Sequence, residues 1–69
     1  MNEFLINIAI DYFNSLRNQH GAENAFENTV CNFPLNEKEI CELMRRLIEK
    51  DNSLKKPLNN TFKWLKNNY

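Results

Sequence analysis

The sequence predicts an all-α fold, a small bundle of four helices over residues 2–20, 22–32, 36–51 and 54–68. Apolar residues recur at intervals of three and four in these stretches, which is the pattern of one buried face of an α-helix. One glycine and two prolines leave little of the turn chemistry that β-hairpins need. The 69 residues are expected to form a single helical domain, 1–69, of a size that removes only about 60% of the unfolded surface from water.

The first helix, residues 2–20, has more apolar positions than one buried face requires. Its polar residues Asn7, Asp11, Asn14 and Asn18 form a narrow stripe. A surface helix needs an apolar stripe of only about 100° or slightly more, so this one is either central in the bundle or covered by a second chain. We therefore predict a homodimer. The residues expected at the self-association interface are Ile6, Ile10 and Phe13.

The second helix, residues 22–32, lies between two stop signals. Gly21 is expected to end the first helix in a left-handed conformation. Pro34 pushes the preceding residue out of the α region and ends the second helix. The positions with helical apolar spacing are Ala22, Ala25, Phe26, Thr29, Val30 and Phe33.

The third helix, residues 36–51, has the most complete start signal in the chain. Asn36 can cap it, and Glu39 can reach back to complete a capping box. On its outer face Glu42 precedes Arg46 by four positions, an arrangement that adds about 0.2 to 0.5 kcal/mol. The residues expected on its buried face are Ile40, Leu43, Met44, Leu47 and Ile48.

The fourth helix, residues 54–68, has the weakest start signal. Polar residues at 59–61 disfavour it, so a short or bent helix that begins as late as Asn60 is an alternative. Trp64 does not share the helical spacing of the other apolar residues in this stretch, and it lies near Lys63 and Lys66. It is either a partly buried ring covered by lysine stems or an exposed anchor for a partner. The apolar line itself consists of Leu54, Leu58, Phe62, Leu65 and Tyr69.

Charge is unevenly distributed although the formal total is zero. Up to Glu42 the chain has seven acidic and two basic residues, and from Leu43 onward it has seven basic and two acidic ones. Either the two halves neutralise each other in the folded monomer, or one charged surface faces a partner.

No motif for catalysis, a cofactor or a metal site stands out, so we expect neither an enzyme nor a bound cofactor or metal. His20, the only histidine, lies in the last helical turn, where its protonated form interacts favourably with the helix dipole. Cys31 and Cys41 are too few for a disulfide scaffold or a four-ligand zinc site. We expect them to be reduced thiols that behave as small hydrophobic residues.

The N-terminal segment and the hydropathy pattern indicate a cytoplasmic protein. No basic residue precedes the first apolar stretch, as it would in a signal peptide, and no apolar run approaches the roughly 20 residues that cross a bilayer. A helix lying on a membrane surface usually carries Lys and Arg in its polar stripe, where residues 2–20 carry mainly Asn and Asp. The many Asn and Lys residues are typical of an AT-rich bacterial or phage gene.

These features favour a small non-enzymatic protein that acts by binding another protein. It would be a regulator, an inhibitor or an immunity factor, encoded by a phage or a mobile element. Its contact would be either the acidic surface or the basic tail around the single tryptophan. The residues predicted to bind the partner are Glu39, Glu42, Arg45, Arg46, Lys63, Trp64 and Lys66.

The alternative is a nucleic-acid-associated adaptor or DNA-binding regulator that uses the basic C-terminal half. The neutral total charge argues against it, because DNA-binding domains are usually basic. A helix-turn-helix made of the second and third helices would also present Glu37 and Glu39 to the phosphates. The residues that would contact phosphate are Arg45, Arg46, Lys55, Lys56, Lys63 and Lys66.

Overall fold

A computed structural model describes residues 2–68, which form four helices and one short 3₁₀ turn. The helices are α1 (Glu3–His20), α2 (Ala22–Asn32), α3 (Glu37–Lys50) and α4 (Lys55–Asn68), with the 3₁₀ turn η1 (Asn52–Leu54) before α4. The predicted all-α fold is confirmed, and the helix bounds agree with the predicted ones to within one residue. The fourth helix is as long as the third, so the alternative of a start at Asn60 is wrong. Tyr69, expected on the apolar line of this helix, lies outside the described residues.

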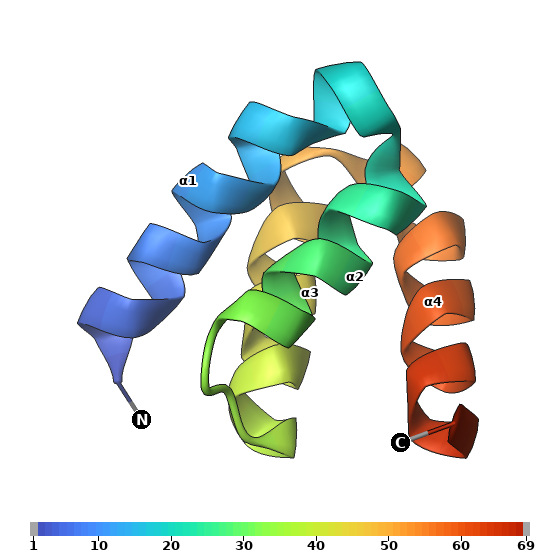
Figure 1. The fold of residues 1–69 in the computed structure, drawn as a ribbon. Coiled ribbons are helices and arrows are strands. Elements are labelled where there is room, and N and C mark those ends of the chain that lie inside the picture. The colour runs from blue at the N-terminus through green and yellow to red at the C-terminus, as the bar shows by residue number, and fades with distance from the viewer. Residues whose placement is uncertain (1, 69) are drawn as a thin grey trace.

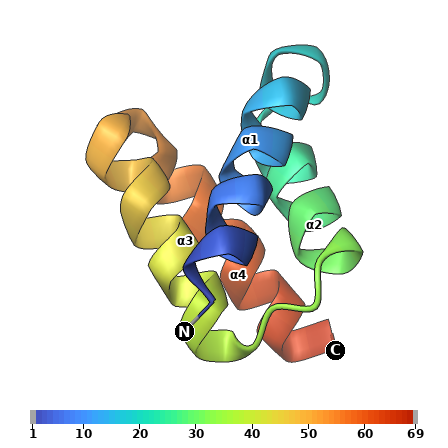
Figure 2. The ribbon, with the colours of Figure 1, turned by 90° about the vertical axis from the view of Figure 1, so that its left-hand side faces the viewer.

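The helices run alternately up and down, and both ends of the chain lie at the same end of the bundle (Figure 1). α2 lies between α1 and α4, while α3 packs against α1 and against η1 (Figures 1 and 2). α1 is therefore covered on two sides, by α2 and by α3. Two neighbouring helices of the same chain therefore cover much of the wide apolar surface of α1, as expected for a helix that is central in the bundle.

The core draws on every helix. The side chains of Phe13 and Phe26 are the largest that are completely buried. Half-buried Ile10, Val30, Ile40 and Phe62 pack against the outside of this core. The buried hydrophobic residues are Ile6, Ala9, Phe13, Ala25, Phe26, Leu43, Met44, Leu47, Leu54, Leu58 and Leu65.

The structure corrects the prediction that Ile6, Ile10 and Phe13 remain for a second chain. Ile6 and Phe13 are completely buried within the monomer, and Ile10 is half-buried against the core. The reason is that α1 packs between α2 and α3, so its central apolar face is already used. The apolar side chains that α1 exposes are Phe4, which is 74% exposed, and Ile8, which is 38% exposed.

Two local features fix the helix connections. Gly21 alone joins α1 to α2, with φ of +82°, and its N–H donates to the carbonyl oxygen of Arg17 at 3.0 Å. The predicted positive φ is confirmed; ψ of 161° places the residue in an extended left-handed region that is essentially reserved for glycine. At the same end of α1, the guanidinium of Arg17 lies 2.9 Å from the carboxylate of Asp51, and this ion pair joins the C-terminal ends of α1 and α3.

Candidate functional site

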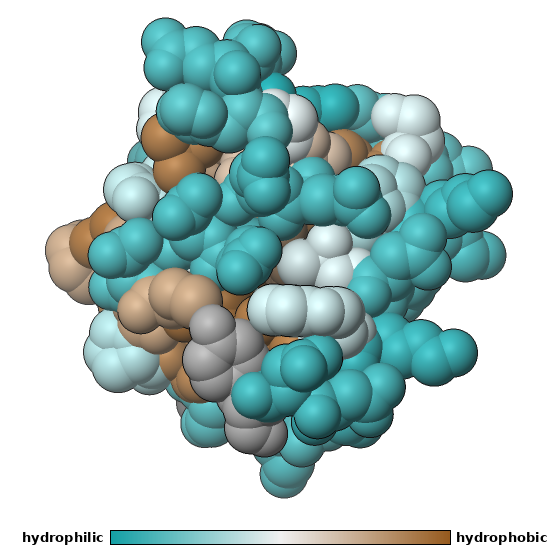
Figure 3. Space-filling view, turned by 45° about the vertical axis from the view of Figure 1, so that its right-hand side comes forward, coloured by the Kyte–Doolittle hydropathy of each residue, from teal (hydrophilic) through white to brown (hydrophobic). Residues whose placement is uncertain are grey.

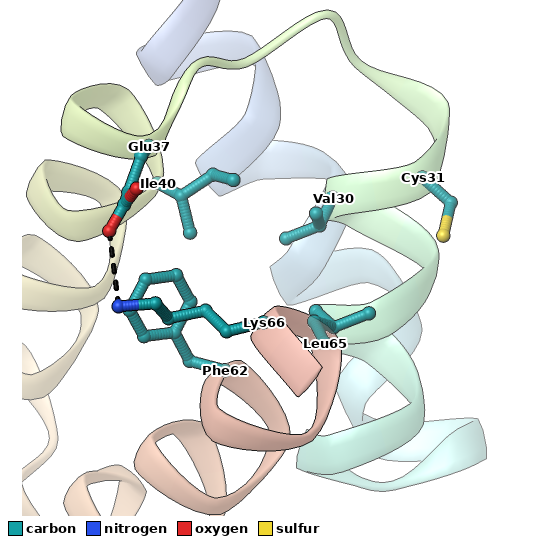
Figure 4. A pocket seen from close by; sticks show the side chains of 7 residues that line it. All are labelled: Val30, Cys31, Glu37, Ile40, Phe62, Leu65 and Lys66. Atoms are coloured by element: carbon teal, nitrogen blue, oxygen red, sulfur yellow. Dashed lines mark ion pairs between the residues drawn. The ribbon is translucent and has the colours of Figure 1, made fainter. Parts of the chain in front are cut away.

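An open, largely apolar groove lies between the end of α2, the first turn of α3 and the second half of α4 (Figure 4). Its volume is about 630 Å³, within the range of about 300 to 1,000 Å³ that is usual for ligand sites. The residues that line it are Val30, Cys31, Glu37, Ile40, Phe62, Leu65 and Lys66.

The groove exists because α3 and α4 diverge. α3 packs on α1 and η1, and α4 packs on α2 and η1, so the first turn of α3 and the last turns of α4 leave space between them. The apolar walls are Val30 from α2, Ile40 from α3 and Phe62 from α4, all half-buried, with buried Leu65 beside them. These side chains face one another across the groove in Figure 4. Each keeps apolar surface that a bound group would remove from water.

An ion pair crosses the mouth of the groove. The ammonium of Lys66 lies 3.3 Å from the carboxylate of Glu37, and 5.5 Å from the centre of the Phe62 ring (Figure 4). The Lys66 and Glu37 side chains are 55% and 67% exposed, so water competes with this pair and its separation costs little. The groove therefore combines apolar walls with a rim that offers one positive and one negative group.

Both cysteines are free, and both are exposed. Because both side chains are exposed, they do not pack as the small hydrophobic residues that the sequence predicted. Cys31 lies on the groove side of α2, where no helix covers it. Cys41 lies on a different face of α3, beside Lys38 and Arg45.

Three residues predicted to bind a partner form a network on the surface of α3 instead. Glu42 accepts hydrogen bonds from Arg45 at 2.6 Å and from Arg46 at 2.7 Å. Arg45 also pairs with Glu49 at 2.6 Å, and Arg46 with Glu3 of α1 at 2.5 Å. The hydrogen bonds from Arg45 and Arg46 lower the pKa of Glu42 from 4.5 to about 2. Of these ion pairs, only Arg46 with Glu3 joins α3 to α1, and the others lie within α3. None of these residues lines the groove.

Glu39, also predicted as a partner contact, has a structural role. Its carboxylate accepts hydrogen bonds from the backbone N–H groups of Asn36 and Asn2, and these bonds lower its pKa. Asn36 in turn accepts a hydrogen bond from the N–H of Glu39 at 2.8 Å, so the predicted capping box is confirmed. Glu39 is almost completely buried and is not available as a surface contact.

The predicted residues of α4 are distributed over different surfaces. Lys66 belongs to the groove, Lys63 is exposed, and Trp64 is 49% exposed at the seam between α2 and α4. Of the residues predicted to contact phosphate, Arg45 and Arg46 are engaged by carboxylates, whereas Lys55 and Lys56 are exposed. The face seen in Figure 3 is mostly hydrophilic, with hydrophobic side chains gathered mainly toward one side.

Sequence reasoning missed the groove walls because it assigned them to the core. Val30, Ile40, Phe62 and Leu65 all have core periodicity, and periodicity identifies the face that turns inward but not whether a neighbouring helix reaches it. The sequence places Glu37 on the acidic surface that could contact a partner, and does not pair it with a residue of α4. The pairing of Glu37 with Lys66 joins residues 29 positions apart and has no local signal.

No protein family model matches this chain, and neither a curated protein nor a solved structure matches it. Within residues 2–68, no three side chains of His, Cys, Asp or Glu are grouped so that they could hold a metal ion. None of the helices in the same range is long and apolar enough to cross a membrane.

Proposed function

We propose that this protein acts by binding another protein, as a regulator, inhibitor or immunity factor, and that the groove between α2, α3 and α4 is its contact. The supporting observation is the groove itself: apolar side chains of three helices, Val30, Ile40 and Phe62, stay partly exposed around a space of about 630 Å³. Covering such side chains removes apolar surface from water, which is the main source of affinity in protein association.

The partner segment that suits this groove is an amphipathic helix. A helix presents large apolar side chains one turn apart on one face, and such anchors fit into grooves between helices. The rim adds polar specificity, because Lys66 and Glu37 can leave their mutual pair and bind a carboxylate and a cation of the partner. The mouth thus accepts a helix whose apolar anchors are flanked by charges of both signs.

The two exposed cysteines provide a matched test. In a Cys41→Ser variant, a photo-crosslinking maleimide attaches to Cys31 on the groove wall; in a Cys31→Ser variant, it attaches to Cys41 on a different face of α3. After irradiation in a lysate of the native host, we expect one protein to be crosslinked through Cys31 and much less through Cys41. Adding Ile40→Lys to the first variant should abolish that crosslink, because a charge then lies among the groove walls.

Equal crosslinking through the two cysteines, or crosslinking through Cys41 alone, would contradict the proposal. So would a crosslink through Cys31 that survives Ile40→Lys in a variant that circular dichroism shows to be folded.

A further inference from the structure

The first half of α1 has an exposed face that carries apolar side chains. Phe4 and Ile8 lie four positions apart, which is about one helical turn, and they are 74% and 38% exposed. Asp11 is exposed one turn further along the same face. Within residues 2–68 the other large apolar side chain that is exposed is Trp64, which lies at the seam between α2 and α4. The α1 face therefore presents two apolar side chains followed by a carboxylate.

This pattern matches the shape of the groove between α2, α3 and α4. The groove is walled by the partly exposed side chains of Val30, Ile40 and Phe62 (Figure 4). A helix docks in such a groove through large apolar side chains one turn apart on one face. Phe4 and Ile8 have this chemistry and this spacing, so the chain itself contains a helix face that suits its own groove.

The charges of the two surfaces are complementary. α4, which forms one wall of the groove, contains four lysines and no acidic residue, whereas the first three turns of α1 contain Glu3 and Asp11 and no basic residue. Asp11 forms no ion pair within residues 2–68. At the mouth of the groove, Lys66 is paired only with the exposed carboxylate of Glu37, at 3.3 Å. An ammonium has three N–H donors, so Lys66 can bind the carboxylate of Asp11 and keep Glu37.

We infer that the groove of one copy of this protein binds the α1 face of a second copy, with Phe4 and Ile8 between the apolar walls and Asp11 at Lys66. α2 lies between α1 and α4, so the α1 face and the groove are different surfaces of one molecule (Figures 1 and 2). The contact is therefore heterologous, and a dimer built on it leaves one groove and one α1 face free. The inference rests on the proposed function, because a second copy covers the groove that the protein partner would occupy.

Two variants that each lose one of the surfaces test the contact in the purified protein. Phe4→Asp alters the α1 face and keeps the groove, and Ile40→Lys alters the groove and keeps the α1 face. In sedimentation at tens of micromolar, we expect a wild-type mass above that of the monomer, two monomeric variants, and a dimer in their equimolar mixture, where one intact α1 face meets one intact groove. A monomeric wild type, a variant that associates like the wild type, or a monomeric mixture of folded variants would overturn the inference.

A charge exchange between exposed residues tests the same contact without altering the core. Asp11→Lys and Lys66→Glu each place like charges together, and we expect each variant to associate about tenfold more weakly than the wild type. Their mixture should regain the lost affinity, because the altered α1 face then meets a groove of opposite charge. Lys56→Glu, also on α4 but outside the groove, is the control and should associate like the wild type. Unchanged association in both variants, or no gain in their mixture, would overturn the inference.

These experiments use the purified protein alone, so their outcome is separate from crosslinking through Cys31 in a lysate. A purified protein that stays monomeric, together with a lysate crosslink to another protein, would overturn the self-contact and support the proposed function. Self-association of the purified protein, together with a lysate crosslink only to a second copy of this chain, would support the self-contact and overturn the proposed function.

Discussion

The carboxylate of Glu39 accepts a hydrogen bond from the backbone N–H of Asn2 at 3.2 Å, across 37 positions of the sequence. Its other oxygen accepts from the N–H of Asn36 at 3.0 Å. One side chain therefore satisfies backbone donors at the beginnings of both α1 and α3, where helices have N–H groups without partners of their own. The start of α1 depends on a side chain of α3.

Glu39→Ala should weaken both helix starts at once. We expect a lower urea midpoint and faster amide hydrogen exchange in the first turns of α1 and α3, because the backbone N–H groups of Asn2 and Asn36 lose their acceptor. Glu49→Ala is the control, since Glu49 pairs only with exposed Arg45 and should leave the midpoint nearly unchanged. Equal midpoints for the two variants would contradict this role of Glu39.

Acid should destabilise the fold through carboxylates that have lowered pKa values. Hydrogen bonds from Arg45 and Arg46 lower the pKa of Glu42 from 4.5 to about 2, and the pKa values of Glu39 and Asp51 are also lowered. Such a group stabilises the folded state above its unfolded pKa, and this stabilisation is lost as the pH falls through its folded pKa. We therefore expect the free energy of unfolding to fall between pH 4.5 and about 2.

Urea unfolding at a series of pH values checks this expectation. Glu42→Gln should lower stability at neutral pH and make its decrease with acid smaller, because one of the shifted carboxylates is gone. A wild-type stability that stays constant down to pH 3, or an unaltered pH profile in Glu42→Gln, would contradict the assignment.

Gly21→Ala should be destabilising for conformational reasons alone. A Cβ at this position would meet no atom within 4 Å, yet φ of +82° is a conformation that L-residues rarely adopt. We expect a loss of about 1 to 3 kcal/mol in the free energy of unfolding. D-alanine, introduced by chemical synthesis, adopts positive φ readily and should retain most of the stability. Equal losses for both alanines would indicate a packing effect instead.

The exposed and buried aromatic residues of α1 should respond differently to substitution. Phe13→Ala empties a completely buried site and should cost about 3 to 5 kcal/mol. Phe4→Asp replaces a ring that is 74% exposed and should change monomer stability by no more than about 0.5 kcal/mol. A large loss of stability in Phe4→Asp would show that this ring supports the fold.

The homodimer remains a prediction, and sedimentation of the wild type and Phe4→Asp tests it. Since α1 exposes Phe4 and Ile8, a dimer formed through this helix should dissociate in Phe4→Asp. A wild type that is monomeric at tens of micromolar, or equal masses for the two proteins, would contradict a dimer built on this face.

The helices were predictable because their signals are local, whereas the groove depends on the arrangement of helices in space. Gly21, Pro34 and the capping box of Asn36 mark helix ends within a few residues of sequence. By contrast, the pair of Arg46 with Glu3 spans 43 positions, and nothing in the spacing of either residue indicates it. Because the sequence does not indicate this pair, it predicts Arg46 as a residue that contacts a partner.

The central claim is that the groove binds a protein partner, and calorimetric titration of the partner identified by crosslinking tests it most directly. Ile40→Ser removes apolar surface from the groove wall, and Ile8→Ser makes the same change on exposed α1. We expect Ile40→Ser to bind about tenfold more weakly than the wild type, because the lost apolar contact is worth more than about 1 kcal/mol, and Ile8→Ser to bind equally well. Equal affinity of Ile40→Ser and the wild type would contradict the claim.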